Sequence, residues 1–176
     1  MIGFLKGKII SQKPTNILLD VNGVGYSINI SINTFEEISE KENIELFIFT
    51  SVKEDSITLF GFSSEAEKEM FELLISVNGI GPRLGLNILS GIRNNELKNA
   101  IQSGNVSRIV AVPGVGKKTA ERLVLELKNK VDSIKEEGEE EIPFSIKKEA
   151  VAALTTLGYS LKVADKAIRD ILSENP

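Results

Sequence analysis

The sequence of 176 residues lacks cysteine, histidine and tryptophan altogether. Without cysteine the chain has no disulfide, no thiolate metal site and no cysteine nucleophile. Without histidine it has neither the commonest general base nor the imidazole of a Ser-His-Asp triad or a zinc site. It also has no apolar run near the roughly 20 residues of a membrane-spanning helix, and its N-terminus does not have the pattern of a secretory signal. These absences disfavour most kinds of enzyme and of membrane protein.

Charge is unevenly distributed along the chain, whose net charge is −4. Residues 77–130 hold 9 Lys or Arg against 3 Asp or Glu, whereas residues 1–76 hold 6 against 12 and residues 131–149 hold 3 against 7. A basic middle segment between acidic neighbours is typical of a surface that binds a polyanion. A solvated basic helical surface would have the same composition, and charge alone does not separate these two interpretations.

Residues 1–63 have the pattern of short β-strands. Apolar and polar residues alternate from 26 to 33, as in a half-buried strand. Asn22-Gly23 separates this run from residues 17–21, and this pair favours the tight turn of a β-hairpin. Further strands are expected at 2–10, 44–52 and 57–62. About five or six short strands in so small a segment indicate a closed or partly closed barrel.

From residue 64 onward the pattern changes to short helices joined by glycine-containing turns. Ser64 and Glu67 have the spacing of a capping box, in which each side chain bonds the backbone of the other residue. An acidic run at 132–142 is expected to be a flexible linker, because its charges repel one another and it has little to bury. Helical periodicity returns from 143 to 176, in a unit too small to be very stable alone.

Residues 78–85 and 113–120 form an internal repeat at an offset of 35, NGIGPRLG against PGVGKKTA. Each copy is expected to be a Gly-apolar-Gly turn between two helices, in which Ile80 or Val115 inserts into the core. The amides at the start of the next helix then point outward and bind a phosphate oxygen, and neighbouring cations strengthen the contact. The candidate DNA-backbone ligands are Gly79, Gly81, Arg83, Gly114, Gly116, Lys117, Lys118 and Arg122.

Two other interpretations of these turns compete with phosphate binding. A single Gly-x-Gly turn would more simply be the corner of a helical hairpin, but two copies in register, both followed by cations, favour the phosphate. The second copy also resembles a nucleotide-binding P-loop, which requires glycine in place of Ala111 and serine or threonine in place of Lys118. Residues 105–111 moreover have a helical pattern rather than that of the strand before a P-loop, so no ATP site is expected.

The tandem turns are those of the helix-hairpin-helix motif, which many proteins use to hold DNA without reading its sequence. The chain further resembles the RuvA family, the Holliday-junction-recognising subunits of the bacterial branch-migration complex, at residues 1–7, 21–26, 53–62, 77–91 and 113–128. This resemblance covers essentially the whole chain. It implies a multi-domain α+β fold with an OB-fold barrel at 1–63, a double helix-hairpin-helix domain at 64–131, the linker at 132–142 and a helical, UBA-like domain at 143–176.

The resemblance also implies an activity and partners. One or two homotetramers would hold a four-way DNA junction open and square-planar, without sequence specificity. The hexameric ATPase RuvB would dock on the C-terminal domain and drive branch migration, and the nuclease RuvC would later cut the junction. The chain itself would be a non-catalytic, cytoplasmic, nucleoid-associated protein of recombination and repair, with no cofactor and no metal.

Two further sites follow from the resemblance. Glu54 and Asp55 match an acidic pair that forms a pin at the junction centre, where carboxylates repel phosphates and disfavour other DNA geometries. By itself such a pair is a common solvated turn. Leu157, Tyr159 and Ile168 are candidates for the RuvB-docking surface, and each would fit the domain's own core equally well. A third C-terminal helix, usual in the family, would have to come from 142–148, or the domain is shorter here.

Two other functions remain as alternatives. One is a generic helix-hairpin-helix repair factor that prefers branched or single-stranded DNA. The other is an enzyme, either a nuclease or a free-standing ATPase. A nuclease needs clustered carboxylates for metal ions, whereas Glu54 and Asp55 are one adjacent pair whose side chains would point apart in a strand.

Overall fold

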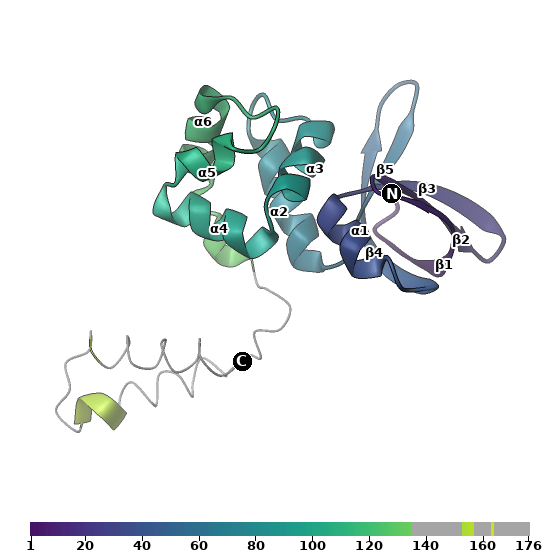
Figure 1. Cartoon of the computed structure of the whole chain (residues 1–176), viewed down its shortest axis with the longest axis horizontal. Helices are drawn as coiled ribbons and strands as arrows, with labels where there is room; N and C mark the ends of the chain where they lie inside the picture. The colour runs from purple at the N-terminus through teal and green to yellow at the C-terminus, as the bar shows by residue number, and fades with distance from the viewer. Residues whose placement is uncertain (135–152, 157–162, 164–176) are drawn as a thin grey trace. The chain divides into compact units, whose positions relative to one another are not determined.

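The structure, a computed structural model, describes residues 1–134, 153–156 and 163 of the chain. The chain divides into two compact units, Met1–Lys135 and Glu136–Pro176. The first unit is a β-barrel followed by a group of helices (Figure 1). In the second unit the described residues are helical at 153–156 and at Val163.

Five strands close into a small barrel, as the short alternating runs predict. They are β1 (Phe4–Lys13), β2 (Asn16–Val21), β3 (Val24–Ile30), β4 (Asn43–Val52) and β5 (Ile57–Phe62), in the order β1-β2-β3-β5-β4. Neighbouring strands are antiparallel except for β3 and β5, which are parallel. Alternate side chains point inward and bury an aliphatic core that includes Ile17, Leu19, Ile28, Ile30 and Leu46. The result is the closed, OB-like barrel that the resemblance implies.

Asn22 and Gly23 form the expected turn between β2 and β3. Both residues have positive φ, 53° and 88°, a conformation that asparagine and glycine tolerate better than other residues. The Asp20 carboxylate accepts a hydrogen bond of 2.8 Å from the amide of Gly23 and so holds the turn. The local prediction of a hairpin is therefore confirmed.

The strand predicted up to residue 33 is too long. β3 ends at Ile30, and a helix that the sequence analysis missed, α1 (Ile32–Ile38), begins directly after Ser31. The Ser31 hydroxyl caps this helix by accepting a hydrogen bond of 2.9 Å from the amide of Thr34. The alternation of isoleucines merely continues into the first turn of α1, where Ile32 is 41% exposed instead of facing the barrel core.

β4 and β5 form a hairpin that projects beyond the barrel (Figure 1). Val52 pairs with Ile57 at its last rung, and the loop at 53–56 follows. Both side chains of this rung are exposed, by 68% and 71%, so the end of the hairpin is not packed against the rest of the unit. The loop therefore presents Glu54 and Asp55 at the tip of an exposed arm.

The helical part of the first unit packs around a single core. Its helices are α2 (Glu65–Ser76), α3 (Pro82–Gly91), α4 (Asn94–Ser103), α5 (Val106–Val110), α6 (Lys117–Leu127) and the short 3-10 helix η1 (Val131–Ser133). Phe71 of α2 contacts Phe60 and Phe62 of the barrel, at ring-centroid distances of 5.4 and 4.8 Å, so this core continues onto the barrel. Val131 and Ile134 are buried in it as well, and packing thus extends past residue 132, where the linker was expected to begin.

A buried carboxylate, that of Glu67, joins the barrel to the helices. Ser64 caps α2 as predicted, and its hydroxyl accepts a hydrogen bond of 3.1 Å from the Glu67 amide. The Glu67 side chain, however, does not return to the Ser64 amide as a capping box requires. Its oxygens accept hydrogen bonds from the hydroxyls of Ser31 and Thr34, both at 2.7 Å, and from the amide of Ser63 at 3.2 Å. The start of α1 and the start of α2 are thereby tied together.

α1 is tied to α3 as well. The amide of Ile32 donates a hydrogen bond of 3.1 Å to the hydroxyl of Ser90, and the side-chain amide of Asn33 donates one of 3.3 Å to the carbonyl of Ile92. The barrel and the helical part are therefore held together by polar contacts in addition to the shared core, which gives the first unit a defined arrangement of its two halves.

The environment of Glu67 predicts how stability depends on pH. Burial raises the pKa of Glu67, Glu37 adds to this, and hydrogen bonds from Thr34, Ser31 and Ser63 offset it in part. A raised pKa means that the folded state binds the proton more tightly than the unfolded state, whose carboxyl has a pKa of 4.5. Stability should therefore fall as pH rises from 4.5 through the raised pKa.

Glu67→Gln, which cannot ionise, should remove this part of the decline. Thermal unfolding followed by circular dichroism, over the pH range from 4.5 to neutral, measures the difference. A variant that loses stability with pH as steeply as the original chain would contradict the prediction.

Candidate nucleic-acid interface

The first glycine turn joins α2 to α3. Gly79 has a φ of +94°, a backbone conformation that residues with a side chain rarely adopt. Ile80 is only 3% exposed, and its amide donates a hydrogen bond of 3.0 Å to the carbonyl of Val77. The apolar residue therefore anchors the turn in the core, as predicted, while Gly79 and Gly81 on either side of it are exposed.

The second glycine turn, between α5 and α6, repeats this geometry 35 residues later. Gly114 has a φ of +87°, and Val115 is 5% exposed, with its amide bonded to the carbonyl of Val112 at 3.1 Å. Every one of these features has its counterpart at the equivalent position of the first turn. We refer to residues 78–82 as the first corner and to residues 113–117 as the second corner.

Each corner presents unbonded amides at the start of the helix that follows. Gly81 and Gly116 precede α3 and α6, and neither has a side chain that could cap the helix. The first hydrogen bonds of these helices run from the amide of Gly85 to the Gly81 carbonyl, at 2.9 Å, and from the amide of Ala120 to the Gly116 carbonyl, at 3.0 Å. The amides before them find no acceptor within the described part of the chain. Free amides at the positive end of a helix dipole form an anion site.

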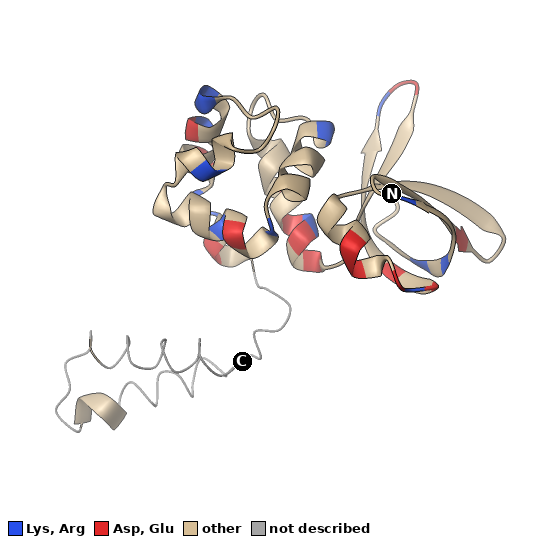
Figure 2. Cartoon of the chain, in the orientation of Figure 1, with Lys and Arg blue, Asp and Glu red and all other residues tan. Residues whose placement is uncertain are grey.

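Cations accompany both corners. Arg83 of α3 and its repeat counterpart, Lys118 of α6, are exposed and form no ion pair with another described residue. Lys117 is exposed too, and its ammonium group lies 3.9 Å from the carboxylate of Glu121. Figure 2 shows basic residues at the starts of α3 and α6. The corners thus combine free amides with positive charge, which is the combination expected of a phosphate site.

Arg122, the remaining cation predicted at the corners, is engaged within the protein. Its guanidinium Nη1 donates a hydrogen bond of 3.1 Å to the carbonyl of Asn78 in the first corner. Its Nε lies 3.9 Å from the carboxylate of Glu126, one turn further along α6. Arg122, which lies on the helix after the second corner, is therefore hydrogen-bonded to the first corner and connects the two.

Glu54 and Asp55 are both exposed at the tip of the β4–β5 hairpin. The hydroxyl of Ser56 donates a hydrogen bond of 3.2 Å to the Asp55 carboxylate. No cation in the described ranges forms an ion pair with either residue. The two carboxylates are therefore exposed to solvent and not held in an ion pair, although the exposed Lys53 precedes them in the same loop.

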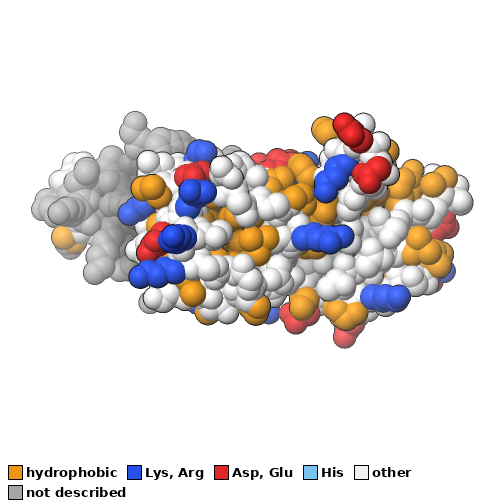
Figure 3. Space-filling model, turned by 90° about the horizontal axis from the view of Figure 1, so that it is seen from above, with side chains coloured by type: hydrophobic (Ala, Val, Ile, Leu, Met, Phe, Trp, Pro, Cys, Tyr) orange, Lys and Arg blue, Asp and Glu red, His pale blue; other side chains and the backbone are white. Residues whose placement is uncertain are grey.

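The corners and the tip of the hairpin point to the same side of the first unit (Figure 1). Figure 3 looks onto this side, where basic side chains are spread over the helical part, and acidic side chains with a basic one beside them stand at the hairpin. The hydrogen bonds at the start of α1 to α2 and α3 hold the barrel, from which the hairpin projects, against the helical part that carries the corners. We call this side, which carries the two corners at 78–82 and 113–117 and the hairpin loop at 53–56, the polar face.

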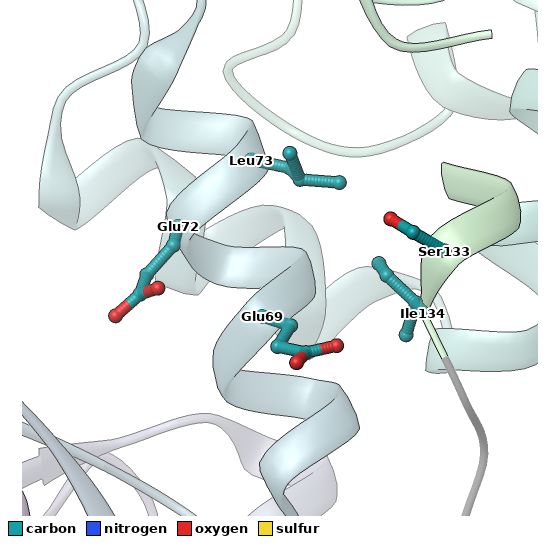
Figure 4. A pocket seen from close by; sticks show the side chains of 5 residues that line it. All are labelled: Glu69, Glu72, Leu73, Ser133 and Ile134. Atoms are coloured by element: carbon teal, nitrogen blue, oxygen red, sulfur yellow. The ribbon is translucent and has the colours of Figure 1, made fainter. Parts of the chain in front are cut away.

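A P-loop and a metal-dependent nuclease site each require a particular arrangement of residues. The helix α5 precedes the second corner, where a P-loop needs a β-strand. Nowhere in residues 1–134, 153–156 and 163 do three or more Asp or Glu side chains gather as metal ligands would. An open pocket of about 320 Å³ is lined by residues of α2 and of the segment around η1 rather than by either corner (Figure 4). Its lining residues are Glu69, Glu72, Leu73, Ser133 and Ile134.

The candidate docking residues Leu157, Tyr159 and Ile168 lie outside the described residues. Among the residues that are described, no helix has both the length and the apolar character needed to cross a membrane.

A closed OB-like barrel joined to two matching glycine corners defines a protein of the tandem helix-hairpin-helix class. Family models agree along the chain: the RuvA N terminal domain matches residues 1–61, the SAM-like helix-hairpin-helix tandem matches residues 71–129, and the RuvA C-terminal domain matches residues 145–176.

Several curated proteins are similar to this chain over nearly its full length. The Holliday junction branch migration complex subunit RuvA of Geobacter sulfurreducens is 46% identical over 181 residues, which cover 99% of this chain and 91% of that protein. Proteins of the same name from Christiangramia forsetii and Syntrophotalea carbinolica are 43% and 40% identical, over 100% and 97% of this chain and 92% and 89% of their own length. The chain belongs to the RuvA family.

Proposed function

We propose that the chain binds four-way (Holliday) DNA junctions without sequence specificity, holds them open and square-planar, and recruits the RuvB ATPase for branch migration. The names of its relatives refer to this junction and to a branch migration complex. The observation that carries the proposal is the pair of corners, which share one turn geometry, unbonded helix-start amides and a flanking cation.

Each corner is suited to the sugar-phosphate backbone of DNA. A phosphate oxygen at the start of α3 or α6 accepts hydrogen bonds from the free amides, and the helix dipole and Arg83 or Lys118 add favourable charge. Contacts of this kind position a backbone and read no bases. Binding should therefore be independent of sequence and strongly dependent on salt, with about 0.9 in log–log slope for each neutralised phosphate.

The acidic hairpin is suited to selecting among DNA shapes. The exposed carboxylates of Glu54 and Asp55, which pair with no described cation, repel a phosphate that approaches the tip. A continuous duplex laid across the polar face brings its backbone past this tip, whereas the centre of an open junction leaves a gap between the strands. The pair therefore acts as a pin that weakens binding to other DNA and keeps the centre of the junction open.

The proposal extends to the assembly. One or two homotetramers would surround the junction, so that every chain contributes two corners to hold the arms and one hairpin to the centre. RuvB would supply the ATP hydrolysis and RuvC the cleavage, so this chain would be a non-catalytic subunit without a cofactor. It would act in the cytoplasm, at the nucleoid, with Leu157, Tyr159 and Ile168 on the surface that binds RuvB.

Competition between DNA shapes tests the proposed function. With a fluorescent four-way junction as the probe, an unlabelled junction should compete on the order of a thousandfold better than an equal-length duplex, as is usual for specific over non-specific DNA binding. Two junctions of unrelated sequence should compete equally, because the corners read no bases. A generic helix-hairpin-helix repair factor would show little preference between junction and duplex, or would prefer single strands, and either result would contradict the proposal.

A further inference from the structure

Two hydrogen bonds link the two copies of the motif, each from the helix after one corner to the other corner. The side-chain amide of Asn87, on α3 after the first corner, donates to the carbonyl of Pro113 in the second corner at 2.6 Å. The guanidinium of Arg122, on α6 after the second corner, donates to the carbonyl of Asn78 in the first corner at 3.1 Å. Each copy of the motif therefore reaches across to the turn of the other.

These two hydrogen bonds are the same contact made in opposite directions. Under the repeat offset of 35 residues, Asn87 corresponds to Arg122 and Asn78 corresponds to Pro113. The donor therefore occupies one position of the repeat in both copies, and the acceptor carbonyl occupies the other. The two motifs are arranged reciprocally, although the donor is an amide in the first copy and a guanidinium in the second.

The acceptor carbonyls lie directly at the turns, so a hydrogen bond to them constrains the position of each corner. Asn78 and Pro113 directly precede Gly79 and Gly114, the glycines whose positive φ reverses the chain. α3 also packs close to the second corner, since a methyl group added at Gly114 would lie 3.6 Å from the Leu84 side chain. Fixing these carbonyls therefore fixes where each helix start, with its free amides, lies relative to the other.

We infer that Asn87 and Arg122 are positioning residues that set the spacing and relative orientation of the two phosphate-binding corners. This inference rests on the proposed function of the corners. Phosphates along a duplex have regular spacing, so two sites held at a matching spacing bind without the cost of ordering them first. Loss of either bond should weaken junction binding while the number of phosphate contacts stays the same.

The distance between the corners in the free protein tests this inference directly. Because the chain has no cysteine, Arg83→Cys and Lys118→Cys introduce unique sites for spin labels at equivalent positions of the two helices. Labelled chains are mixed with an excess of unlabelled chains, and double electron–electron resonance then gives the distance distribution within one chain. We expect a narrow distribution that broadens when Asn87→Ala or Arg122→Ala is added. Lys117→Ala, which removes an exposed side chain beside the same corner, is the control and should leave the distribution narrow.

Junction affinity with the native Arg83 and Lys118 gives the second readout. Asn87→Ala and Arg122→Ala should each weaken binding about threefold to tenfold for each chain that contacts the junction, as expected for one hydrogen bond per chain. Neither should change the dependence on salt, whereas Lys118→Gln, which removes a proposed phosphate contact, should lower the log–log slope by about 0.9 for each chain that contacts the junction. Equal helical circular dichroism in all variants ensures that folded proteins are compared.

Two results would overturn the inference. One is a corner-to-corner distribution that stays narrow in both variants, and the other is a salt slope that falls for Arg122→Ala as much as for Lys118→Gln. The distance measurement contains no DNA, so it judges the positioning role even if the original chain fails to prefer junctions. That failure would count against the proposed function alone.

Discussion

Replacing Arg83 and Lys118 together by glutamine lowers the affinity for a four-way junction by about a hundredfold at about 0.1 M salt for each chain of the complex in which the two side chains neutralise one phosphate each. These two residues occupy equivalent positions after the two corners, and neither is held in an ion pair by another described residue. The free amides of the corners stay in place in this variant, so binding is weakened rather than lost. Fluorescence anisotropy at several salt concentrations measures both the affinity and the slope, which should fall by about 0.9 for each contact removed.

A matched control separates the corners from net charge. The double variant with Lys13→Gln and Lys41→Gln changes the net charge by the same amount. Both lysines are exposed, and Lys13 is the last residue of the barrel strand β1. We expect this control to bind the junction almost as well as the original chain, with an almost unchanged slope. Equal losses in the two double variants would show that general electrostatic attraction, and not the corners, holds the DNA.

Replacing Glu54 by glutamine and Asp55 by asparagine has the opposite effect. Binding to an equal-length duplex should tighten about thirtyfold for each hairpin that the duplex passes, since each of the two removed charges contributes about 1 kcal/mol of repulsion to a phosphate some 4 Å away in water. Junction affinity should change less, because the phosphates of an open junction stay away from the tip. The same competition assay gives both affinities, and the preference for junctions should shrink accordingly.

The control for the acidic pair removes equal charge from elsewhere on the barrel. The double variant with Glu40→Gln and Glu42→Gln changes two residues near the start of β4, away from the hairpin tip. It should leave the duplex affinity unchanged. If duplex binding and branch migration with RuvB are both unaltered when Glu54 and Asp55 are neutralised, the pin does not exist.

Local signals predicted much of this molecule. The Asn22-Gly23 turn and the serine cap of α2 depend on neighbouring residues only, and both are present. The corners were predictable for a related reason. Glycine at a positive φ, followed by a buried aliphatic residue, is a local solution, and its recurrence 35 residues later distinguished it from a chance turn.

Contacts between distant segments were not predictable in this way. The carboxylate of Glu67 was assigned to the local capping box, but its partners are Ser31, which caps α1, and Thr34 in the first turn of α1, 36 and 33 residues earlier in the chain. α1 itself was not predicted, because its first residue, Ile32, continues the apolar–polar alternation of β3. The only local sign was Ser31, a residue that favours helix starts.

Arg122 shows the same limit within the site. Its type and its place after a glycine corner are typical of a phosphate ligand, yet its guanidinium is bonded to the carbonyl of Asn78, 44 residues away. The repeat did contain a signal, since Asn87 and Asn78 align with Arg122 and Pro113. That alignment pairs the two donors with each other and the two acceptors with each other. Only the structure shows that each donor bonds the acceptor carbonyl of the other copy.

The central claim is that the free amides of both corners bind DNA phosphates, and hydrogen–deuterium exchange tests it most directly. Exchange of the peptides covering 78–85 and 113–120 should be compared in the free protein and in its complex with a four-way junction. Both peptides should exchange more slowly in the complex, while the β2–β3 turn at Asn22-Gly23, which carries no such site, should be unaffected. Unchanged exchange at both corners in a saturated complex would mean that the DNA is held elsewhere.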